Sequence, residues 1–152
     1  MEDLSLHILD IAENSISGSA KTIEIRIDED RTKDLLTIEI KDDGKGMDEQ
    51  TLQKALDPFF TTRTTRRVGL GLPLLAQAAR ESGGGIELDS KPGRGTTVRA
   101  TFAYGHVDRK PMGDIDETIL TLVAGHPEID ILYEHNRNGS IYHFDTRETA
   151  KK

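Results

Sequence analysis

The chain has 152 residues, of which 35% are hydrophobic and 31% charged, with a formal net charge of −7 and no cysteine. This balance predicts one globular domain with a substantial core. The missing cysteines exclude disulfides and thiolate metal sites, and the negative charge argues against a nucleic-acid partner. No apolar run approaches the roughly 18 residues of a membrane helix, and the N-terminus lacks a signal-peptide layout, so we expect a cytoplasmic location and no membrane partner.

Hydrophobic periodicity predicts the elements of the first two thirds of the chain in the order helix, two strands, helix, loop, helix, two strands. Helical spacing predicts helices over residues 4–16, 48–56 and 72–82. Alternation of apolar and polar residues predicts strands at 23–27 and 36–40 and strands that begin at Ile86 and Val98. This order predicts an α+β fold, a two-layer sandwich of a mixed, mainly antiparallel sheet with helices on one face.

Residues 105–152 differ in character from residues 1–104, and we expect them to form a C-terminal extension. A polar linker at 106–113 precedes a predicted helix at 114–124, two strands at 129–135 and 140–145, and a frayed tail at 146–152. The turn Asn136-Arg137-Asn138-Gly139 is typical of a β-hairpin. A hairpin edge needs covering, so the extension is expected to pack on the rest of the chain or on a partner, including a second copy in a homodimer.

Asp10 and Asn14 lie four residues apart on the first predicted helix and project from the same side, one turn apart. A solvated helix flank explains such a pair. The pair also suits an active-site edge, because an Asn carbonyl is a good oxygen ligand for Mg²⁺ and a nearby carboxylate can act as a general base.

Three further stretches combine an acid, glycines or cations with the end of a strand or the start of a helix. The segment Asp42-Asp43-Gly44-Lys45-Gly46 follows a strand, and its glycines let a ligand approach the backbone. The next stretch begins with Asp57-Pro58-Phe59-Phe60-Thr61-Thr62-Arg63, and the arginines that follow either bind phosphates or form a solvated basic loop. It ends with Val68-Gly69-Leu70-Gly71-Leu72, whose backbone N–H groups at a helix start can bind phosphate. The last stretch is Gly93–Thr97.

Taken together and in this order, the four stretches resemble the boxes of the Bergerat-fold (GHKL) ATPase superfamily. That superfamily comprises DNA gyrase, the ninety-kilodalton heat-shock chaperones, the histidine kinases and the mismatch-repair ATPases. The resemblance covers residues 1–104, and several boxes are most similar to the histidine-kinase ATPase domain (HATPase_c). It implies a stand-alone domain of this kind, without a dimerisation and phosphoacceptor domain.

The resemblance implies ATP and Mg²⁺ as cofactors and a role for each matching residue. Asn14 matches the magnesium-binding Asn. Asp10 matches the general base of the hydrolysing and serine-kinase branches, where Glu is usual. Asp42 matches the acid that accepts from the adenine amine, and Thr97 matches a threonine near the base. The remaining nucleotide-binding positions are Gly44, Gly46, Phe60, Thr61, Arg63, Gly69, Leu70, Gly71 and Leu72.

Three functions are compatible with this pattern. The first is a kinase that transfers the γ-phosphoryl group to a partner protein in bacterial-type signalling, as anti-sigma-factor serine kinases do. The second is an interaction module in which ATP changes the affinity for a partner protein without significant turnover. The third is an ATPase like the gyrase or mismatch-repair relatives, which carry a further domain.

Overall fold

The computed structural model describes residues 3–54, 71–106, 109 and 111–150. The strands in this part are β1 (Thr22–Asp30), β2 (Leu35–Asp42), β3 (Gly85–Lys91), β4 (Gly95–Ala103), β5 (Asp130–Arg137) and β6 (Ser140–Asp145). The helices are α1 (Leu4–Ser17), α2 (Glu49–Lys54), α4 (Gly71–Glu81), α5 (Ile115–Gly125) and α6 (Thr146–Ala150). No helix within these ranges is long and apolar enough to cross a membrane.

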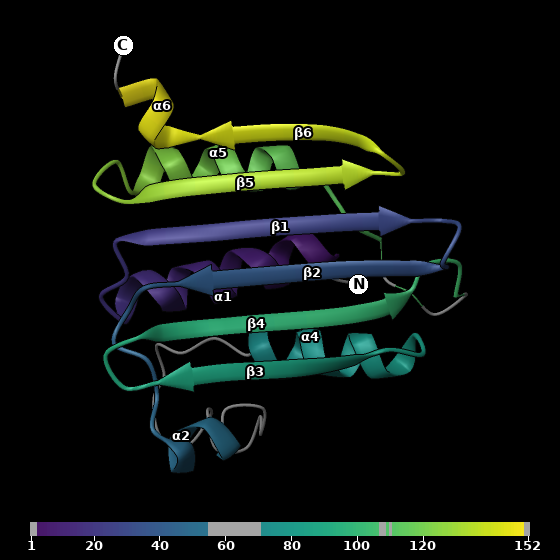
Figure 1. Ribbon diagram of the computed structural model, residues 1–152, viewed down its shortest axis with the longest axis horizontal. Helices are drawn as coiled ribbons and strands as arrows, with labels where there is room; N and C mark the ends of the chain where they lie inside the picture. Colours follow the sequence, from purple (N-terminus) through teal and green to yellow (C-terminus); the bar gives the residue numbers. More distant parts are fainter. Residues whose placement is uncertain (1–2, 55–70, 107–108, 110, 151–152) are drawn as a thin grey trace.

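The strands form one sheet in the order β3-β4-β2-β1-β5-β6 (Figure 1). Strands β1 and β5 pair in parallel, and the other neighbouring pairs are antiparallel. The helices α1, α4 and α5 lie behind the sheet in Figure 1, on one face. The predicted α+β architecture, a mainly antiparallel sheet covered by helices, is therefore confirmed.

The core lies between the sheet and the three long helices. Residues at alternating positions of β1, β2 and β4 are buried, as the sequence alternation predicts, and they meet the apolar faces of α1 and α4. The central members of this core are Ile23, Ile25, Ile27, Leu36, Ile38, Ile40, Ala100 and Phe102. Since Asp42 continues the buried register of β2, the end of the strand delivers its carboxylate to the helix side of the sheet.

The extension joins the sheet through β5, which pairs with β1 over eight positions from Thr22↔Asp130 to Glu29↔Arg137. The edge of β1 is thus covered by the same chain (Figure 1). On the helix layer, His126 at the C-cap of α5 lies 2.6 Å from the Glu13 carboxylate of α1. The extension therefore contacts both the central sheet and the helix that carries Asp10 and Asn14.

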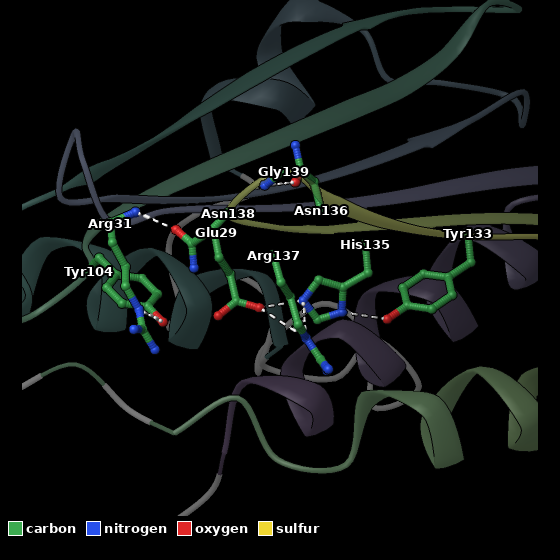
Figure 2. Close-up of polar contacts among 9 residues, drawn as sticks. All are labelled: Glu29, Arg31, Tyr104, Tyr133, His135, Asn136, Arg137, Asn138 and Gly139. Atoms are coloured by element: carbon green, nitrogen blue, oxygen red, sulfur yellow. Dashed lines mark hydrogen bonds and ion pairs between the residues drawn. The ribbon is translucent and has the colours of Figure 1, made fainter.

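A chain of polar side chains crosses the boundary between β1 and β5 (Figure 2). His135 is only 3% exposed, and its two ring nitrogens contact Glu29 on one side and the Tyr133 hydroxyl, at 2.8 Å, on the other. Burial raises the pKa of Tyr133, and the nearby Asp116 carboxylate raises it further. Tyr133 therefore stays protonated and can donate to His135, so these buried polar groups are satisfied where the extension meets the central sheet.

The last residues correct one prediction from the sequence. Residues 146–152 were expected to fray, but Thr146–Ala150 form α6. The Asp145 carboxylate accepts from the Arg147 backbone N–H at 2.9 Å, and the Arg147 side chain lowers the pKa of Asp145 by hydrogen bonding to it. The Thr146 hydroxyl accepts from the Ile131 N–H at 2.8 Å. These contacts hold the helix against β5.

Candidate nucleotide-binding site

Three of the four sequence motifs meet at the end of β2. The Ser15 hydroxyl of α1 donates to Asp42 Oδ2 at 2.7 Å. The backbone N–H groups of Gly44 and Thr96 donate to Asp42 Oδ1 at 2.9 and 3.3 Å. One carboxylate therefore joins α1, the glycine turn after β2 and the start of β4.

These bonds fix the direction in which the Asp42 carboxylate faces. A carboxylate offers about four acceptor positions, two on each oxygen. Among the described residues, two donors reach Oδ1 and one reaches Oδ2. A lone pair on Oδ2 thus remains available to an incoming donor, and the exocyclic amine of adenine is such a donor.

The loop after β2 is fastened on two sides by backbone hydrogen bonds. The Lys45 N–H donates to the Gly18 carbonyl at the end of α1 at 2.9 Å, and the Gly93 N–H donates to the Lys45 carbonyl at 2.7 Å. The Met47 N–H donates to Ser90 Oγ at 2.8 Å. The loop is therefore positioned by α1 and by the β3–β4 turn.

The loop glycines meet the backbone of neighbouring segments at close range. A Cβ added to Gly46, which has a φ of +70°, would lie 2.0 Å from the Lys91 carbonyl oxygen. A Cβ added to Gly44 would lie 2.8 Å from the Gly18 carbonyl oxygen. The sequence predicted that these glycines make room for a ligand. That role stays a prediction, and what the structure shows is that they let neighbouring backbone segments approach one another.

The Asp43 side chain binds the backbone at the start of β1. Its Oδ1 accepts from the backbone N–H groups of Lys21 and Thr22, at 2.7 and 2.9 Å, where β1 begins. Burial by itself raises the pKa of Asp43, but the N–H groups of Thr22 and Lys21 lower it, and the net pKa lies below its usual value. The second acid of the motif therefore anchors the start of β1.

Replacing Asp43 by Asn is expected to lower the free energy of unfolding at pH 7 by less than about 1 kcal/mol, because the site is exposed and solvent screens the charge. The folded-state pKa of Asp43 is depressed, so its stabilising effect is present above the unfolded pKa of about 3.9 and is lost as the pH falls through the folded pKa. Urea unfolding at pH 7 and below pH 4 should show the difference between wild type and variant shrinking in acid. A constant difference would contradict this role of the charge.

The threonines of β4 lie on opposite faces of the sheet. Thr96 is opposite Asp42 in the β2–β4 register, whereas Thr97 is opposite Lys41. Since opposing residues share a face and successive residues alternate, Thr96 lies on the Asp42 side and Thr97 on the other. The register therefore favours Thr96 over Thr97 as the neighbour of the Asp42 carboxylate, and the choice of Thr97 as the threonine beside the base stays a prediction.

Asp10 and Asn14 both lie on α1, as predicted, with Asp10 exposed and Asn14 half-buried. The hydroxyl of Ser15, the residue after Asn14, reaches Asp42. The helix thus carries Asn14 directly beside the residue that contacts the Asp42 carboxylate. The roles of Asp10 as base and Asn14 as magnesium ligand stay predictions.

The remaining motif, residues 57–72, lies within the described residues only at its end. Gly71 and Leu72 are the first two residues of α4, and Leu72 packs against the core. The first turn of a helix presents unpaired N–H groups, which suit phosphate. The other predicted contacts of this motif lie outside the described residues: Phe60, Thr61, Arg63, Gly69 and Leu70.

The structure adds three residues to the predicted site: Ser15, Ser90 and Thr96. Ser90 Oγ accepts from the Met47 N–H and lies 2.9 Å from the Gly95 carbonyl and 2.8 Å from Thr96 Oγ1. Thr96 has the same strand parity as the buried Val98, a signal that the sequence contained. Ser90 likewise has the same strand parity as Ile86 and Leu88. Ser15 carries no comparable signal, because the sequence does not tell which helix turn faces Asp42.

Comparison with known proteins agrees with this geometry. Residues 2–106 match the family model described as histidine kinase-, DNA gyrase B-, and HSP90-like ATPase. The match covers the described site, from α1 to the end of β4. It ends where the extension begins.

Curated relatives are similar over the same region. The chain is 36% identical to the sensor protein kinase FleS of Pseudomonas aeruginosa over 110 residues, which cover 72% of this chain and 27% of FleS. It is 40% identical to the nitrogen regulation protein NtrY of Azorhizobium caulinodans over 79 residues, covering 51% of this chain and 10% of NtrY. The chain thus spans about a quarter or less of these relatives.

Solved structures share the fold. The Aquifex aeolicus MutL ATPase domain complexed with ADP superposes with a TM-score of 0.52 at 16% identity, covering 95% of this chain and 62% of that one. The N-terminal domain of a DNA repair protein gives a TM-score of 0.60 at 17% identity, covering 94% and 52%. From its motifs, its fold and the family match, the chain belongs to the histidine kinase-, DNA gyrase B- and HSP90-like (GHKL) ATPases.

Proposed function

We propose that residues 1–104 bind Mg-ATP as a histidine-kinase-like domain and that the protein transfers the γ-phosphoryl group to a partner protein. The observation that carries the proposal is the Asp42 carboxylate, which is held by Ser15, Gly44 and Thr96 with an acceptor position open. Relatives named as sensor kinases support transfer of the phosphoryl group to a protein rather than to water.

The chemistry of the described donors fits this nucleotide. Asp42 accepts from the adenine amine, and the Thr96 hydroxyl lies on the same side of the sheet beside it. Asn14 offers a carbonyl oxygen to Mg²⁺. When bound, the metal ion neutralises charge on the β- and γ-phosphates.

Asp10 is proposed as the general base. In the transfer, the bond between the γ-phosphorus and the bridging oxygen of ATP breaks, a bond from phosphorus to an acceptor side-chain atom forms, and ADP leaves. Asp10 would take the acceptor's proton one helical turn from Asn14. The proposed nucleotide contacts between residues 57 and 72 are Phe60, Thr61, Arg63, Gly69, Leu70, Gly71 and Leu72.

One observation favours a second candidate function, an interaction module gated by ATP. Glu13, which precedes Asn14, lies 2.6 Å from His126 of the extension. A change at Asn14 upon nucleotide binding would therefore reach α5 through a direct contact. Partner affinity would then depend on nucleotide without turnover.

Replacing Asp10 by Ala is expected to lower phosphoryl transfer by roughly 10²–10⁴-fold, because general-base catalysis contributes about that much. The measurement incubates γ-labelled Mg-ATP with wild type or variant in a lysate of the source organism and follows label on protein bands. The matched control is Asp28→Ala, which removes an exposed carboxylate on β1 and should leave transfer unchanged.

The outcomes separate the candidates. Label that moves to a protein band with wild type and is lost with Asp10→Ala supports the kinase. ATP that stays bound and unreacted supports the gated module. Equal labelling by wild type and Asp10→Ala would contradict the role of Asp10.

A further inference from the structure

The two edges of the sheet differ in how they are protected against pairing with another strand. Strand β3 at one edge exposes Glu87, Asp89 and Lys91. Charged side chains of this kind are a common defence of an edge strand. Strand β6 at the other edge has no Lys, Arg, Glu or Pro, and its single acid, Asp145, is buried and paired with Arg147. Strand β6 is the outermost strand on this side of the sheet (Figure 1), so the backbone donors and acceptors on its outer side lack that defence.

Strand β6 also exposes large apolar side chains on both of its faces. Tyr142 is opposite His135 in the β5–β6 register, and Ile141 is opposite Asn136. Tyr142 therefore lies on the helix side with the buried His135, and Ile141 lies on the other side. Tyr142 is 55% exposed and Ile141 62% exposed. Neighbouring apolar residues on both faces are typical of a strand that is covered on association.

The helix side of this edge is also hollowed. A pocket of about 320 Å³ is lined by residues of α5, β5 and β6, among them Asp116, Tyr133, His135, Arg137 and Tyr142. The Tyr133 and Tyr142 rings lie 5.8 Å apart, centroid to centroid, in its wall. The helix layer thus leaves a hollow at the same edge that exposes Ile141 and Tyr142.

We propose that β6 pairs with β6 of a second copy of this chain, antiparallel and about a two-fold axis, to give one continuous sheet. In any antiparallel register of the two β6 strands centred between Ile141 and His143, no two acids and no Lys or Arg pair lie opposite each other. The net charge of −7 is therefore not concentrated at this contact. An isologous contact closes both edges at once, and a continued sheet adds side chains beside the hollow. This inference is independent of the proposed nucleotide chemistry.

The test measures the mass of the full chain in solution by sedimentation equilibrium at tens of micromolar. Wild type is expected at twice the chain mass of 16.8 kDa. Ile141→Lys, which introduces a charge on the edge without touching the core, is expected to be monomeric. The matched control is Leu120→Lys on α5, where the leucine is 63% exposed, and it should remain dimeric. A monomeric wild type, or a dimeric Ile141→Lys, would overturn the proposal.

Hydrogen exchange tells which surface a dimer uses. The β6 amides that face away from β5 are expected to be protected in wild type and to lose at least tenfold of that protection in Ile141→Lys, since pairing in a sheet slows their exchange. A dimeric wild type whose β6 amides exchange as fast as those of the variant would use another surface and would overturn the proposal. Neither readout involves nucleotide, so failure here leaves the proposed function standing.

Discussion

Asp42→Asn is expected to weaken ATP binding by roughly 10–100-fold, the value of a hydrogen bond to a charged group. The Asn carbonyl keeps the acceptor for the Gly44 and Thr96 N–H groups, and its NH₂ faces the Ser15 oxygen, which can accept. The fold is therefore retained. At the open position, however, the variant presents a donor to the donating adenine amine.

Isothermal titration of wild type and Asp42→Asn with Mg-ATP measures this effect, and thermal melting checks the fold. Ser15→Ala is the matched control, because it leaves the Asp42 carboxylate intact and removes only one of its partners. The control is expected to bind ATP within a few-fold of wild type. If Asp42→Asn bound ATP as tightly as wild type, the assignment of the adenine site would be wrong.

Gly95→Ala is expected to destabilise the protein by about 3 kcal/mol or more, the largest effect on stability among these variants. Gly95 has a φ of +85°, and an added Cβ would lie 2.0 Å from the Asp42 carbonyl oxygen. Backbone strain and overlap therefore act together at this position. Both effects act at the end of β2, where Asp42 lies.

Gly93→Ala is the matched control for strain alone. Gly93 has a φ of +79° and an added Cβ would meet no atom within 4 Å, so the expected cost is about 1–2 kcal/mol. Thermal unfolding should lower Tm by roughly 6–12 °C for Gly95→Ala and by a few degrees for Gly93→Ala. Equal shifts would show that the close approach to Asp42 has no energetic weight.

Much of the central sheet and one end of the site could be predicted from the sequence. The alternation in β1 and β2 specifies which residues face the helices, and it extends to Asp42 at the strand end. The same alternation applied to β4 would have placed Thr96, rather than Thr97, on that side. The choice of Thr97 followed the motif alone and did not use the strand register.

Other features depend on tertiary contacts that local patterns do not encode. The parallel pairing of β5 with β1 joins segments about a hundred residues apart, and the periodicity of each strand is the same whatever its neighbour. Helix α6 forms because its first residues are held by two hydrogen bonds. The Ile131 N–H donates to the Thr146 hydroxyl, and the Arg147 N–H donates to the Asp145 carboxylate. The bonds of Ser15 and Ser90 likewise depend on how the elements meet.

The most direct test of the central claim is titration of the wild-type chain with Mg-ATP and with Mg-GTP. A carboxylate that accepts from the adenine amine faces a lone pair on the guanine O6, so we expect ATP to bind and GTP to bind at least about 100-fold more weakly. Binding of the two nucleotides with equal affinity, or no binding of ATP at millimolar concentration, would contradict an adenine-selective site at Asp42.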